Sequence, residues 1–125
     1  MADSERRARG AAKFQEVMGF APPRVEGSPF FDQTLEHLFA EVWSRPGLAV
    51  RERRLVTLTL LMQLGHEGTL KLHLGAALRS GDLSEADLEE LVLHVAHYAG
   101  WPSAALGFQV LGQLRAERAK ESAGG

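Results

Sequence analysis

The chain has 125 residues, of which 45% are hydrophobic and 24% charged, as expected for one globular domain. Fourteen basic and sixteen acidic side chains give a formal charge of −2, which argues against nucleic acid or an anionic membrane as a partner. The chain contains no cysteine, which excludes disulfides, thiolate metal sites, iron–sulfur clusters and thiol nucleophiles.

The first 29 residues are expected to precede the main domain. Residues 4–18 are charged and alanine-rich, which predicts a short helix, and residues 19–29 hold three prolines and two glycines, which predicts an irregular linker. We therefore predict an N-terminal helix and linker over residues 1–29, a helical domain over residues 30–118, and a flexible tail over residues 119–125.

Helical periodicity begins after the linker. Apolar residues recur at helical spacing from Phe30 to Trp43, and Arg45-Pro46-Gly47 ends that helix. The next segment, residues 50–64, contains the uncharged apolar run 55–62. A helix that is apolar on every side is buried on every side, so we expect another subunit to supply part of its cover.

No run of the sequence approaches the ~20 apolar residues of a membrane span. No apolar signal core follows the first residues either, and we therefore expect a cytoplasmic protein without a membrane partner.

Three more helices follow, each with a local start or stop signal. A helix through Leu70 and Leu78 ends at Gly81, and Ser84-Glu85-Ala86-Asp87 is close to a capping box. Pro102 is suited to the first turn of the last helix, and no segment alternates with period two. The sequence thus predicts an all-α protein of about six helices.

His73 is the strongest candidate for chemistry, because it shares a helix face with Leu70 and Leu74 and should be at least half buried. One interpretation is a core histidine held by hydrogen bonds. The other is a general acid or base in an apolar cavity, where burial tunes the pKa. His66, in the preceding turn, could approach the same region.

The other histidines are weaker candidates. His37 lies among polar positions and should face solvent. His94 and His97 are three residues apart and could hold a metal together, but no carboxylate or cysteine motif completes such a site, and we predict none.

Cations gather near the start of the apolar helix: Arg45, Arg51, Arg53 and Arg54. Such a cluster can bind carboxylates through bidentate contacts. It can equally be a solvated helix start that pairs with Glu41 and Glu52. The aromatic residues Trp43, Tyr98 and Trp101 are most simply core or interface residues.

Several short motifs occur together in one order: Glu41-Val-Trp-Ser-Arg-Pro-Gly-Leu48, Arg51-Glu-Arg-Arg-Leu-Val-Thr-Leu58, Leu64-Gly65, Leu72-His73-Leu74-Gly-Ala-Ala-Leu78 and Tyr98-Ala-Gly-Trp-Pro102. From about Phe30 to Leu114, the chain resembles the carboxymuconolactone decarboxylase family. The resemblance implies an all-helical bundle of the alkylhydroperoxidase D type and assembly as a homotrimer or homohexamer.

The resemblance also separates two branches of this superfamily. The alkylhydroperoxidase branch has a C-x-x-C pair before the histidine that matches His73, and those two positions are His66 and Thr69 here. Its relay glutamate corresponds to Arg54. Thiol peroxidase activity is therefore not expected.

The decarboxylase branch lacks those cysteines and, as the resemblance implies, converts 4-carboxymuconolactone to 3-oxoadipate enol-lactone without a metal or organic cofactor. The resulting hypothesis assigns proton transfer to His73, with a supporting hydrogen bond from His66. The candidate substrate-binding residues are Arg45, Arg53, Trp43 and Tyr98.

The chain matches the family pattern only loosely over Gly19 to Pro29. It also departs from the pattern at His97, where an apolar or aromatic residue is expected. These departures indicate that the substrate can be another lactone or carboxylated ring. Two alternatives stay open: a catalytically silent helical oligomer that binds a small molecule or protein, and a metal-dependent enzyme that uses His94 and His97.

Overall fold

The computed structural model describes residues 2–124, and every regular element in that range is helical. The helices are α1 (Ala2–Met18), α2 (Pro29–Gln33), the π-helix η1 (Thr34–Val42), α3 (Val50–Leu64), α4 (Glu67–Ser80), α5 (Glu85–Tyr98) and α6 (Trp101–Gly124). The all-α class expected from the sequence is confirmed. None of these helices combines the length and apolar character required to cross a bilayer.

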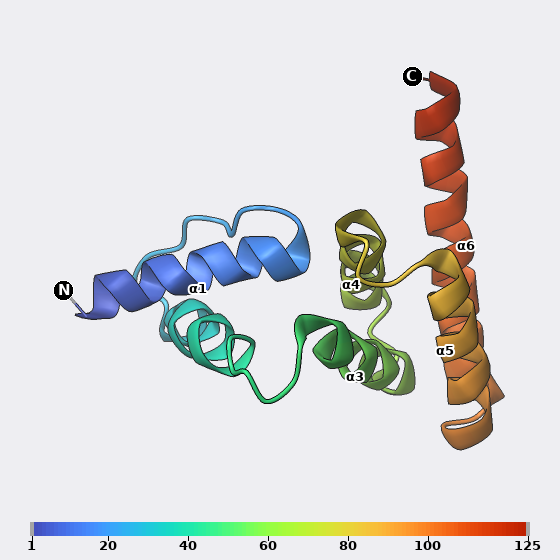
Figure 1. Ribbon diagram of the computed structural model, residues 1–125, viewed down its shortest axis with the longest axis horizontal. Helices are drawn as coiled ribbons and strands as arrows, with labels where there is room; N and C mark the ends of the chain where they lie inside the picture. Colours follow the sequence, from blue (N-terminus) through green and yellow to red (C-terminus); the bar gives the residue numbers. More distant parts are fainter. Residues whose placement is uncertain (1, 125) are drawn as a thin grey trace. The chain divides into compact units, whose positions relative to one another are not determined.

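The chain forms two compact units, Met1–Arg53 and Arg54–Gly125, which are described separately. The boundary between them does not coincide with the one predicted after residue 29. The reason is that α1 packs along η1 within the first unit (Figure 1), so the N-terminal helix is part of a core.

The core of the first unit is aromatic. Phe14 of α1 meets Phe39 of η1 with ring centroids 5.0 Å apart in an edge-on arrangement, and Trp43 stacks on Phe39. The backbones of α1 and η1 approach closely at Gly10, where a methyl group would lie 1.8 Å from the carbonyl oxygen of Leu35. Glycine is needed at position 10 because no side chain fits there.

The helix predicted from Phe30 to Trp43 begins as an α-helix and continues as a π-helix. Ser28 caps its start by accepting a hydrogen bond from the backbone N–H of Phe31 (3.2 Å), and Pro29 occupies the first turn. At its end the N–H of Trp43 donates to the carbonyl of Leu38, five residues back (2.9 Å).

Four helices build the second unit around one apolar core (Figure 1), and α5 packs beside α6. The predicted end signals are confirmed. Gly81 adopts a left-handed conformation (φ 80°) at the end of α4. Ser84 and Asp87 form a reciprocal capping box at the start of α5, with bonds of 3.0 and 2.9 Å.

The last helix continues to Gly124, where the sequence predicts a flexible tail over residues 119–125. The helix makes ion pairs with distant parts of the chain just before that segment. Glu117 accepts from Lys71 of α4 (2.7 Å), and Arg115 pairs with Glu89 of α5.

Helix α3 is buried along one face only within this chain. Its buried residues Leu58 and Met62 face the core, whereas Val56, Leu60 and Leu64 are 54%, 53% and 65% exposed. Burial on every side is therefore not reached in the single chain, and the cover expected from another subunit stays a prediction.

Candidate functional site

His73 lies on the buried face of α4. It is 9% exposed and shares that face with the core residues Leu70, Leu74 and Ala77. Burial of the imidazole, reinforced by the positive charge of Arg54, lowers the pKa of His73 from 6.5 to about 4. At neutral pH the resting side chain is therefore an uncharged imidazole, with one nitrogen able to accept a proton.

Arg54 is a buried cation of the second unit. Its side chain is 1% exposed, and its Nε donates to the Asp82 carboxylate at 2.9 Å. Because a guanidinium stays charged at any working pH, it needs an anion or oriented dipoles when it leaves water. The positive charge of Arg54 contributes to the lowered pKa of His73.

Arg54 belongs to the cation cluster of the sequence but is not among the predicted site residues. The signal that identifies it is its spacing. Arg54, Leu58 and Met62 are four residues apart, and all three are buried on one face of α3. An arginine in step with the core positions of a helix is predicted to lie inside the protein.

Three of the candidate substrate-binding residues lie in the first unit. Arg45 is exposed, and Arg53 is half-buried and donates from Nη2 to the carbonyl of Arg45 (3.3 Å). Trp43 is buried in the aromatic core and stacks on Phe39 with centroids 6.2 Å apart. Their participation in the site stays a prediction.

The two remaining candidates are exposed residues of the second unit. His66 precedes α4 at its N-terminus, and its side chain does not cap the helix. Tyr98 is 85% exposed at the end of α5 and stacks on His94 with centroids 5.0 Å apart. Neither shares the burial that tunes His73, and their roles also stay predictions.

The other histidines lie on the surface. His37 is exposed, as predicted, with its Nδ1 3.3 Å from the Glu41 carboxylate. His97 is exposed, with its Nδ1 2.8 Å from the carbonyl of Leu93. Within residues 2–124, no three or more histidine, aspartate and glutamate side chains are grouped as a metal site requires.

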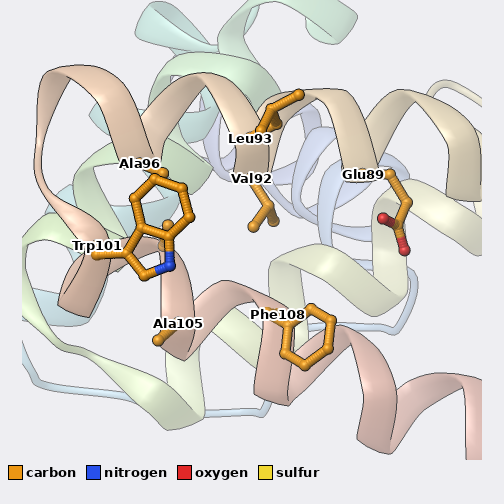
Figure 2. Close-up of a pocket in the computed structure, with 8 residues that line it drawn as sticks. Glu89, Val92, Leu93, Ala96, Trp101, Ala105 and Phe108 are labelled. Atoms are coloured by element: carbon orange, nitrogen blue, oxygen red, sulfur yellow. The ribbon is translucent and has the colours of Figure 1, made fainter.

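An apolar groove of about 350 Å³ lies between α5 and α6. Figure 2 shows Val92 and Leu93 on one side of it and Ala105 and Phe108 on the other. The only charged side chain that lines the groove is Glu89. Neither His73 nor a cation lines it, so its composition does not suit an acidic substrate.

The lowered pKa of His73 predicts a pH-dependent stability. Between pH 6.5 and about 4 the unfolded chain binds a proton on this imidazole and the folded chain does not. The free energy of unfolding therefore falls as the pH falls through this window, by about 3 kcal/mol in total, and the contribution of His73 is constant below it. Urea unfolding at a series of pH values measures this change.

His73→Gln is the matched control for that measurement. The carboxylates titrate in both proteins, so the difference between the two pH curves isolates the contribution of His73. Parallel curves between pH 4 and 7 would contradict the assignment.

Comparison with known proteins agrees with the resemblance read from the motifs. A profile described as "Carboxymuconolactone decarboxylase family" matches residues 28–113. The chain is 36% identical over 110 residues to a 4-carboxymuconolactone decarboxylase of Acinetobacter baylyi, which covers 82% of this chain and 81% of that protein. It is 40% identical over 68 residues to a nitrosuccinic acid decarboxylase of Metarhizium robertsii, which covers 54% of this chain and 47% of that protein.

Proposed function

Because the chain belongs to the carboxymuconolactone decarboxylase family, we propose that it is a cofactor-independent decarboxylase of a small carboxylated lactone such as 4-carboxymuconolactone. The family membership and the name of the bacterial relative support the reaction class. The observation that supports the mechanism is the burial of His73, with its lowered pKa, in a core that also contains the buried cation Arg54.

The chemistry explains why a histidine and a cation suffice. When the C–C bond to the carboxylate breaks, carbon dioxide leaves and the electron pair passes through the ring double bond to the lactone carbonyl. The resulting dienolate then takes one proton at a ring carbon, and that proton comes from solvent overall. Fixed positive charge stabilises the dienolate, and a positioned acid delivers the proton.

His73 delivers that proton in the proposed mechanism. Its resting imidazole is uncharged, and the negative charge of an arriving substrate favours the protonated form. The imidazolium then protonates the ring carbon and returns to its resting state. The supporting hydrogen bond from His66 and the substrate contacts of Arg45, Arg53, Trp43 and Tyr98 stay part of the hypothesis.

The nitrosuccinic acid decarboxylase supports the same chemical logic. The acid in its name also has an electron-withdrawing group beside a carboxylate, and that group can accept the electron pair when carbon dioxide leaves. The shared requirement is an acid with an electron sink, held where a proton can reach the new carbanion.

Carbon dioxide release from 4-carboxymuconolactone by the purified protein tests this function. We expect catalytic turnover without added metal or cofactor. A rise in melting temperature with the lactone, but no carbon dioxide, would favour the alternative of a catalytically silent binding protein.

We also propose that the chain assembles as a homotrimer or homohexamer through the exposed apolar face of α3, formed by Val56, Leu60 and Leu64. An apolar stripe of this kind is stabilised when a second copy covers it. The cytoplasmic location expected from the sequence stays a prediction.

Leu60→Asp tests the assembly, because it places a charge at the centre of that face. We expect a shift towards the monomer mass in light scattering coupled to gel filtration. Phe30→Asp is the control, since Phe30 is 82% exposed and lies outside α3. An unchanged mass for Leu60→Asp would rule out this face as the interface.

A further inference from the structure

Arg54 and His73 are the two buried polar side chains of the chain between residues 4 and 124. They lie on consecutive helices, α3 and α4, and the charge of Arg54 acts on His73. Every other buried side chain in that range is apolar or a glycine. The core of the second unit therefore contains two polar side chains, this arginine and this histidine.

Stability alone does not explain a cation at this position. Removing a guanidinium from water is strongly unfavourable, and an apolar residue of similar volume is often as stable or more stable. The Asp82 carboxylate pairs with the guanidinium at 2.9 Å, but its side chain is 37% exposed, so water and dissolved anions compete with it. Because this counterion is open to solvent, another anion can exchange with it.

We propose that Arg54 binds the carboxylate that the substrate retains through the reaction. Before the substrate arrives, the Asp82 carboxylate pairs with this guanidinium, and the substrate carboxylate then displaces Asp82. The inference rests on the proposed decarboxylase function and deepens it. Asp82 offers the same chemical group as the substrate, on the Nε of Arg54 at 2.9 Å. Because Asp82 reaches solvent, an incoming carboxylate can follow the same route to the guanidinium.

The retained carboxylate is the one that Arg54 must hold. A contact with the departing carboxylate would weaken as that group becomes neutral carbon dioxide, so it would stabilise the bound substrate more than the transition state. A contact with a second carboxylate keeps its full strength and positions the reacting carbon beside His73. The substrate class is therefore a dicarboxylate with one carboxylate next to an electron sink.

Arg54 differs in its burial from the two arginines selected from the sequence as substrate-binding candidates. Arg45 is exposed, where ion pairs contribute little, and Arg53 already donates to the carbonyl of Arg45. A guanidinium shielded from water binds a carboxylate more strongly. The buried position thus favours Arg54 as the carboxylate-binding residue.

Steady-state kinetics with 4-carboxymuconolactone tests the inference through Arg54→Lys and Asp82→Asn. Lysine keeps the charge but loses the two-pronged contact, so we expect KM to rise about tenfold and kcat to change less. Asparagine keeps a hydrogen-bond acceptor for Arg54 but removes the competing charge, so KM should fall. The matched control is Arg118→Lys, an exposed arginine of α6 that has no role in the proposed site and for which we expect an unchanged KM.

An Arg54→Lys protein with KM within twofold of the unaltered chain would overturn the inference. So would Asp82→Asn with an unchanged or higher KM, and this second variant decides the matter if Arg54→Lys does not fold. Loss of substrate affinity in Arg45→Lys or Arg53→Lys instead would assign the carboxylate to those residues.

Calorimetric measurement of succinate binding distinguishes the failure of this inference from the failure of the proposed function. If the chain releases no carbon dioxide but binds succinate, and Asp82→Asn binds it more tightly, the reaction fails and the role of Arg54 stands. If the chain decarboxylates the lactone and these variants bind succinate equally, the role of Arg54 fails and the reaction stands. A chain that does neither overturns both.

Discussion

Replacing His73 with glutamine is expected to lower kcat for decarboxylation about 10²–10⁴-fold, which is the usual contribution of a positioned acid or base. Glutamine has a similar length and keeps hydrogen-bonding groups, but it cannot take up a proton near neutral pH. Since His73 is uncharged in the folded chain at pH 7, the substitution removes no charge. Carbon dioxide release under saturating substrate measures the effect.

The surface histidine His37 provides the control. It is exposed on η1 and pairs with Glu41, and no argument places it in the site. His37→Gln should keep full turnover. A His73→Gln protein that folds and retains kcat within threefold of the unaltered chain would remove His73 from the mechanism.

Gly10→Ala is expected to destabilise the first unit by about 3 kcal/mol, the upper end of what overpacking usually costs. The added methyl group would lie 1.8 Å from the Leu35 carbonyl oxygen, and the obstacle is backbone that no side-chain rotation can clear. Helix α1 must then separate from η1. Trp43 reports the change, because it is buried in that core and its fluorescence should shift to the red.

Two features make this measurement specific. Trp101→Phe removes the other tryptophan, which is 65% exposed, so that the signal comes from Trp43 alone. Gly112→Ala is the matched control, since Gly112 is also helical but has no atom within 4 Å of the added group. It should raise stability by about 0.5–1 kcal/mol. Equal stabilities for Gly10→Ala and Gly112→Ala would contradict the close approach at Gly10.

The elements predicted correctly from the sequence are those with local signals. The bounds of α3 follow from Arg45-Pro46-Gly47 before it and Gly65 after it. The capping box of α5 and the left-handed end of α4 are formed by residues within a few positions of each other. The burial of His73 likewise follows from the spacing of its apolar neighbours on one helix.

Features that depend on distant contacts were not predictable in this way. The widening of the helix at Thr34 occurs where η1 meets α1, and no residue type in that segment specifies it. The ion pairs of α6 also join distant residues, such as Lys71, 46 residues before Glu117. The burial of Arg54 was predictable from its helical spacing, but the identity of its partner Asp82 depends on how α4 ends.

Helix α3 joins two surfaces of different kinds in one rigid body. One face holds Arg54 among core residues, and the opposite face presents Val56, Leu60 and Leu64 to solvent. A helix of 15 residues moves as one unit. A displacement of its outer face therefore also displaces the guanidinium of Arg54. If copies associate through that face, the geometry around the arginine depends on protein concentration, and specific activity then declines on dilution.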